Sequence, residues 1–248
     1  MKKNVCKTVS VFGITVMMMS ASPSMANPNA NNMSVDHLSW SQLPTGIQDY
    51  YQANAKTNTL DLSLKDIVAI RSWSSTEGDQ YLVQLQHSSE ANSPDQPSDE
   101  LITHLYNIEG TQVRRVWQIY DHIPCDGLDV IASYAADTAV ISDIDNDGVV
   151  EVSVPYYLGC RGDVSYDEMK IITYEGKQKF AIRGNSAICD SKTGLPVDKT
   201  GYYGGDYKID EQLLQRAALS ASQKTVFREH LKSVWRDNQC SIYFNYDD

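Results

Sequence analysis

The residue types best suited to chemistry lie in the segment 143–151, where three aspartates at alternate positions are followed by a glutamate. This spacing puts carboxylates on one side of a tightly coiled backbone, and Gly148 stands where such a backbone must turn sharply. Carboxylate and carbonyl oxygens are the ligands that Ca²⁺ prefers. The segment therefore predicts a calcium loop with the ligands Asp143, Asp145, Asp147, Val149 through its backbone carbonyl, and Glu151.

The residues around these acids indicate what kind of loop this is. An EF-hand has an acid at its twelfth position, where this chain has Val154, and helices on both sides, whereas the flanking residues here favour strands. Residues 138–154 resemble the strand-loop-strand calcium sites of integrin-type propeller repeats, the FG-GAP and VCBS families, which usually have Asp where Glu151 stands. The resemblance implies a structural ion that locks a turn between two strands. An Asx-rich turn without metal is the alternative.

A second resemblance covers about residues 121–184. The segments 159–165, 169–172 and 174–184 are similar to an uncharacterised family of exported bacterial proteins, some of which are labelled surface polysaccharide biosynthesis proteins. This resemblance implies a location in the bacterial envelope, and it assigns no mechanism to any residue.

Residues 1–26 are typical of a signal peptide. Three lysines accompany an apolar run at 9–19 that is too short to span a bilayer, and residues 24–26 supply the small side chains of a cleavage site. We therefore expect the mature chain to begin at Asn27, to have no membrane span, and to be periplasmic or secreted.

The acidic composition limits the partners of this chain. Its formal net charge is −11, and removal of three leader lysines without any acid changes this to about −14. Nucleic acid is excluded as a partner, because its binding depends on clustered Lys and Arg. Solubility alone explains the acidity, and attraction of cations or basic proteins is the alternative.

Four cysteines follow the leader, an even number that favours two disulfides over free thiols in an oxidising compartment. Four cysteines allow three pairings. We prefer Cys125 with Cys160, which flank neighbouring strands around the calcium loop, and Cys189 with Cys240, which would tie back the C-terminus. A zinc site is the weaker alternative, because no two of these cysteines have close ligand spacing.

The elements that must position these residues follow from hydrophobic periodicity. A segment 27–60, flexible to about Leu43 and with a short helix at 43–51, precedes a β-rich domain at 61–248. We expect hairpins and a loop-like stretch at 185–207, then two helices within 210–238 and a last strand at 241–246. The expected strand pairs are 67–74 with 80–87, 101–108 with 112–120, 128–134 with 138–142 before the loop, and 169–174 with 179–183, while 149–158 follows the loop.

Together these patterns predict a mainly β, antiparallel protein, a meander, sandwich or partial propeller-like fold with a C-terminal helical hairpin. The histidines are scattered without metal spacing, and no catalytic constellation emerges, so a non-enzymatic, monomeric envelope protein is favoured. Doubled tyrosines, including Tyr202 and Tyr203, suggest a glycan-binding face, although tyrosines also suit half-buried strands. The sequence 161–163 is an Arg-Gly-Asp tripeptide that we interpret as a turn. The alternatives for function are a polysaccharide-acting enzyme and an acidic inhibitor of a basic host enzyme such as lysozyme.

Overall fold

A computed structural model describes residues 33–55, 63–88, 98–125, 129–136, 138–162, 165–197 and 203–244. Residues Asn31–Asp248 form one compact unit. The predicted signal peptide, the residues 89–97, the aspartate of the Arg-Gly-Asp tripeptide and Tyr202 lie outside the described residues.

The first sheet has five antiparallel strands in the order β1-β2-β3-β4-β5. Gly78 and Gly110 take positive φ values of 99° and 63° at its two hairpin turns, which favours glycine there. Both hairpins predicted between residues 67 and 120 are confirmed. The strands are β1 (Asp36–His37), β2 (Ile67–Ser75), β3 (Gly78–Ser88), β4 (Ser98–Glu109) and β5 (Gln112–Pro124).

The second sheet has the order β12-β10-β9-β8-β6, and β7 also pairs with β8. The predicted hairpin of 128–134 with 138–142 is wrong, because β6 and β7 pair one after the other along the same long strand, β8. A pattern of apolar residues predicts a strand but does not name its partner. The strands are β6 (Asp129–Tyr134), β7 (Val140–Ser142), β8 (Glu151–Arg161), β9 (Glu168–Glu175), β10 (Gln178–Asn185) and β12 (Tyr207–Ile209).

A small third sheet joins β11 (Ala187–Asp190) to β13 (Cys240–Phe244) in parallel. The prediction of a loop throughout 185–207 is therefore wrong, because β11 gains a partner from a distant part of the chain. The sulfur atoms of Cys189 and Cys240 are 1.99 Å apart beside this pairing, and those of Cys125 and Cys160 are 2.10 Å apart. These are the two pairs that the sequence favoured.

The helices begin close to the positions that the sequence indicates. Helix α1 (Thr45–Ala55) overlaps the predicted helix, and the 3₁₀ helices η1 (Trp40–Gln42) and η2 (Leu64–Asp66) lie before and after it. Asp210 caps α2 (Glu211–Arg216), and Ser220 with Gln223 forms the predicted capping box of α3 (Ala221–Asn238). The predicted flexibility up to Leu43 is wrong for residues 36–43, because β1 pairs with β2 and Leu43 is buried.

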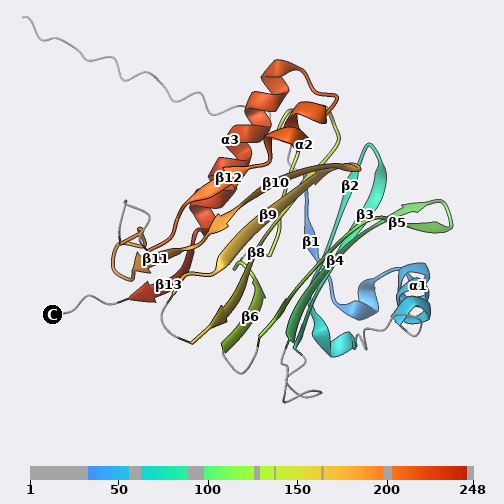
Figure 1. The fold of residues 1–248 in the computed structure, drawn as a ribbon. Helices are drawn as coiled ribbons and strands as arrows, with labels where there is room; N and C mark the ends of the chain where they lie inside the picture. The colour runs from blue at the N-terminus through green and yellow to red at the C-terminus, as the bar shows by residue number, and fades with distance from the viewer. Residues whose placement is uncertain are drawn as a thin grey trace, which may run out of the picture. The chain divides into compact units, whose positions relative to one another are not determined.

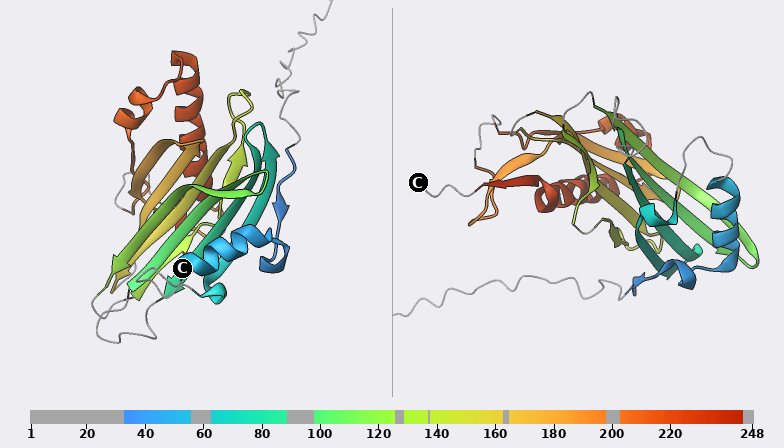
Figure 2. Two further views of the ribbon diagram at one scale, coloured as in Figure 1. Left: turned by 90° about the vertical axis from the view of Figure 1, so that its right-hand side faces the viewer. Right: turned by 90° about the horizontal axis from the view of Figure 1, so that it is seen from below.

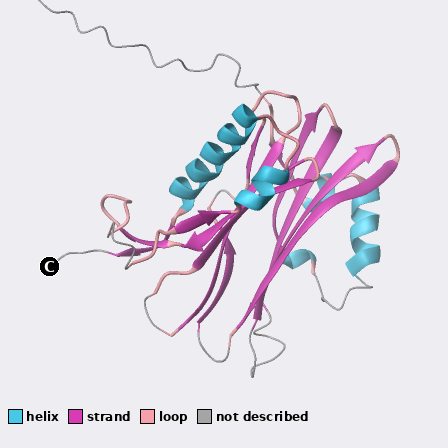
Figure 3. Cartoon of the chain, turned by 45° about the horizontal axis from the view of Figure 1, so that its top comes forward, coloured by secondary structure: helices cyan, strands magenta, loops and turns pink. Residues whose placement is uncertain are grey.

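The described unit has four layers, which Figure 1 and Figure 2 show from three sides. Residues of both large sheets share one core, which includes Trp73, Trp117 and Val152, so the sheets pack face to face. Helix α1 covers the outer face of the first sheet with Ile47, and α3 covers the outer face of the second with Trp235. Figure 3 shows these helices on either side of the strands. The mainly β, antiparallel prediction is confirmed, in its sandwich form.

Candidate metal centre

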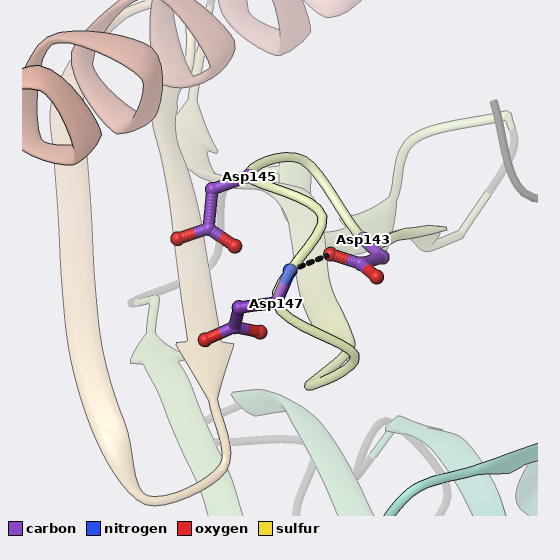
Figure 4. A group of neighbouring side chains, drawn as sticks. All are labelled: Asp143, Asp145 and Asp147. Atoms are coloured by element: carbon purple, nitrogen blue, oxygen red, sulfur yellow. Dashed lines mark hydrogen bonds between the residues drawn. The ribbon is translucent and has the colours of Figure 1, made fainter. Parts of the chain in front are cut away.

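The acidic loop connects β7 to β8 and is pre-shaped by its own hydrogen bonds. Asn146 and Gly148 have φ values of 61° and 88°, so the chain reverses within a few residues. The carboxylate of Asp143 accepts from the backbone N–H groups of Asp147 and Gly148, both at 3.1 Å, and Asp147 accepts from Val149 N at 2.8 Å. Figure 4 shows the side chains of Asp145 and Asp147 on the same side of this coil.

The turn between β2 and β3 holds the loop from the first sheet. Thr76 Oγ1 donates to the carbonyl oxygen of Gly148 at 2.5 Å. A Cβ on Gly148 would lie 2.9 Å from Thr76 Cγ2, closer than such atoms approach in folded proteins. Gly148 is therefore required both by its φ angle and by this contact.

The structure gathers the predicted acids into two overlapping groups. One oxygen from each of Asp143, Asp145 and Asp147 lies within 4.8 Å of the others. Asp145 also belongs to a second such group with Glu151 and Glu175. Sequence reasoning missed Glu175, which stands at the end of β9, 24 positions after Glu151.

The register of the sheet explains how Glu175 reaches this place. Glu151 and Glu175 are direct partners across the antiparallel pair β8 and β9, and their neighbours Val152 and Tyr174 point into the core between the sheets. Alternation then puts both glutamates on the outer face, beside the start of α3. Like charges directly opposite each other on adjacent strands are destabilising unless something neutralises them.

Three oxygens of these acids lack partners in the described part of the chain. They are buried and belong to Asp145, Glu151 and Glu175. Glu151 is 0% exposed, with Oε2 accepting from Ile144 N at 2.7 Å and Oε1 left without a hydrogen bond. Gln223 Nε2 from α3 donates to Asp145 Oδ2 at 2.7 Å. A buried carboxylate oxygen without a hydrogen-bond donor is destabilising, and either a bound cation or a proton on the carboxylate would relieve this cost.

The pKa values of Glu151 and Glu175 are both raised, as expected for buried carboxylates that lie close together. The pKa of Glu151 is raised to about 8, mainly by burial and also by the charges of Asp145 and Glu175, against the lowering effect of the Ile144 N–H. The pKa of Glu175 is raised to about 7, mainly by burial and also by repulsion from the three aspartates, Asp145 first, and from Glu77. The salt bridges of the described residues bring no Lys or Arg to Asp145, Glu151 or Glu175.

These residues offer oxygen ligands only, the type that Ca²⁺ and Mg²⁺ prefer. Ca²⁺ takes six to eight oxygen ligands in flexible geometry, and the five carboxylates supply hard oxygens without the imidazole or thiolate that zinc prefers. The fully buried Glu151, with its free oxygen, is the observation that an Asx-rich turn alone does not explain. The carbonyl of Val149 remains a predicted ligand.

The arginine, histidines and tyrosines that stood out in the sequence are not members of the two acidic groups. Arg161 pairs with Asp167 at 3.1 Å and donates to Ser165 O at 3.1 Å, so this arginine is a structural residue. No histidine takes part in the two acidic groups. Of the doubled tyrosines, Tyr51 and Tyr156 are buried core residues, whereas Tyr203 is exposed.

The chain was compared with protein-family models, with curated proteins and with solved structures, and none of them matches it. Within the described residues, no helix has the length and apolar character needed to cross a membrane. What this protein does must therefore be argued from its own residues.

Proposed function

We propose that this chain is an exported, non-enzymatic envelope protein whose β sandwich is stabilised by one structural Ca²⁺. The observation that carries the metal assignment is the opposed pair Glu151 and Glu175, which share a buried site with Asp145 and lack a neutralising cation. The ion would hold the loop, the β9 end and, through Gln223, the start of α3 together.

A structural role follows from the number of protein ligands. Five carboxylates and one carbonyl would fill most of the six to eight positions around Ca²⁺, which leaves little room for a substrate. The two disulfides support a compartment outside the cytoplasm, and we assign the protein to the periplasm or the extracellular space. Calcium is abundant enough there for a site of modest affinity to be filled.

For the binding role, we propose a glycan or another envelope component as the partner. Among the described residues, four tyrosines are exposed: Tyr120, Tyr166, Tyr203 and Tyr207. A Cβ on Gly204 would lie 3.0 Å from Tyr166 Cγ, so Tyr203 and Tyr166 belong to one region of the surface. Exposed tyrosine rings offer an apolar face and a polar hydroxyl, which suits sugars. A glycan array, read with the wild type and with Tyr203→Ala, tests this part of the proposal; equal binding by both proteins would contradict it.

The metal assignment is tested by thermal unfolding with and without calcium. We expect Ca²⁺ to raise the melting temperature of the wild type and Asp145→Ala to abolish that rise, because Asp145 belongs to both acidic groups. Asp49→Ala removes an exposed carboxylate on α1 and serves as the control that keeps the full rise. Equal melting temperatures of the wild type in chelator and in calcium would refute the assignment.

A further inference from the structure

A row of cationic side chains crosses the second sheet on the face that looks toward the first sheet. Lys170 on β9 is the direct partner of Arg183 on β10, and Arg183 is the partner of Lys208 on β12. Their neighbours Ile171, Ile182 and Ile209 pack under α3 on the opposite face, so alternation puts the cations on the inner face. Like charges in adjacent positions destabilise a sheet, so such a row calls for an explanation.

The row borders a small cleft between the two sheets. The cleft has a volume of about 180 Å³ and is lined by Lys170, Lys179 and Arg183 from the second sheet and by Asp121 from β5. Asp121 is the single carboxylate among its lining residues, so three cations face one anion there. This excess of positive charge stands out in a chain whose formal net charge is −11.

The one carboxylate is already engaged. Asp121 Oδ2 accepts from Lys170 Nζ at 2.8 Å and from the hydroxyl of Tyr156 at 2.9 Å, and Tyr156 itself is buried. Lys170 has a further partner in Glu168 at 3.4 Å. Lys170 is thus neutralised by protein groups, and it takes up the Oδ2 atom of Asp121.

The side chains of Lys179 and Arg183 face the cleft and are paired less closely than that of Lys170. Lys179 is half-buried, and its side chain makes no hydrogen bond or ion pair with any other described residue. Burial and then the nearby Arg183 lower the pKa of Lys179, and the more weakly acting Asp121 and Asp210 oppose them without reversing the shift. Arg183 reaches Asp210 only at 3.7 Å, and both of these side chains are partly exposed, so the pair is worth little.

We propose that this cleft is a binding site for a small oxyanion, a phosphate or carboxylate group, held by the ammonium of Lys179 and the guanidinium of Arg183. A guanidinium presents parallel N–H donors that match two oxygens of such a group, and a lysine adds a compact charge beside it. The cleft is smaller than the roughly 300–1,000 Å³ of sites for drug-sized ligands, so it has room for one charged group, either free or at the end of a larger molecule.

This site is independent of the metal centre. Lys179 and Arg183 point toward the first sheet, whereas Glu151 and Glu175 lie on the opposite face of the second sheet. The two assignments can therefore fail separately, and the anion is best tested on calcium-free protein so that no metal bridges it.

The test is isothermal titration of the disulfide-bonded, calcium-free protein with inorganic phosphate and, separately, with acetate. The variants are Lys179→Gln and Arg183→Gln, and the control is Lys65→Gln, which removes one exposed cation near the first sheet. We expect saturable binding of at least one anion, weakened about tenfold or more in each cleft variant and unchanged in the control. Binding of phosphate alone would identify a phosphate group as the ligand, and binding of acetate alone would identify a carboxylate group.

Two results would overturn the proposal. One is the absence of saturable binding of either anion by the wild type. The other is equal weakening in Lys65→Gln, because net charge rather than the cleft would then account for the affinity. Amide chemical shifts of Lys179 and Arg183 during the titration give a second measurement, and they must move with the same saturation curve.

Discussion

Glu151→Gln is the substitution that distinguishes a metal centre most sharply from a hydrogen-bonded turn. Glutamine keeps the shape of the side chain and an oxygen that can accept from Ile144 N, but it removes the negative charge. Because Glu151 faces the carboxylates of Asp145 and Glu175, the substitution has opposite effects in the absence and presence of calcium.

Without metal, the substitution removes an electrostatic cost that Glu151 imposes on the folded state. The pKa of Glu151 is raised from 4.5 to about 8, so at pH 7 the folded state either takes up a proton or buries an unfavourable charge. Since each pKa unit corresponds to about 1.4 kcal/mol, the free energy of unfolding of the metal-free protein should rise by up to about 3 kcal/mol in the variant.

With metal, the substitution removes an anionic ligand. A ligand present at a hundredfold excess over its dissociation constant stabilises the wild type by about 2.7 kcal/mol, or roughly 5–10 °C in melting temperature for a domain of this size. We expect the variant to lose most of this calcium-dependent gain.

The assay is thermal unfolding of the wild type, Glu151→Gln and the exposed control Glu109→Gln, in chelator and in saturating calcium. A variant that is less stable than the wild type in chelator and that keeps the whole calcium-dependent gain would refute this reasoning. Glu109→Gln should match the wild type in both conditions.

Two further predictions concern the rest of the fold. Replacing Cys125 and Cys160 together by Ser should lower the free energy of unfolding by about 2–4 kcal/mol, because the disulfide no longer restricts the unfolded chain. Urea unfolding measures this change, and an unchanged free energy would contradict a formed disulfide. Burial and Arg115 lower the pKa of His104 from 6.5 to about 4 in the folded protein. As the pH falls, the unfolded state therefore takes up a proton at a higher pH than the folded state does, and stability is lost between pH 6.5 and pH 4. Between pH 7 and pH 5 the wild type should lose about 2 kcal/mol more than His104→Gln, and equal losses in urea titrations would contradict this.

Local patterns predicted most of the strands and helices, because they depend on nearby residues. Alternating apolar residues located the strands from β2 to β5, and the capping box at Ser220 and Gln223 located the start of α3. Pairing partners were harder to predict, because they depend on distant segments. For this reason the shared partner of β6 and β7 and the parallel pairing of β11 with β13 were missed.

The same distinction applies to the two sites. Asp143, Asp145, Asp147 and Glu151 are close in sequence and could be recognised as one group, whereas Glu175 joins them only through the register of β8 and β9. A glutamate at the end of the second strand after the loop was the available signal. The cationic cleft needs the register of three strands and the packing of two sheets, and no local spacing indicates it.

The central claim is that an ion neutralises the carboxylates at the junction of the loop, β8 and β9. The most direct measurement is a crystal structure of the protein grown in calcium. We predict one ion bound by the carboxylates of Asp143, Asp145, Asp147, Glu151 and Glu175 and by the carbonyl of Val149, with oxygen distances of about 2.3–2.6 Å. A structure in calcium that shows no ion, with these side chains turned apart into solvent, would contradict the claim.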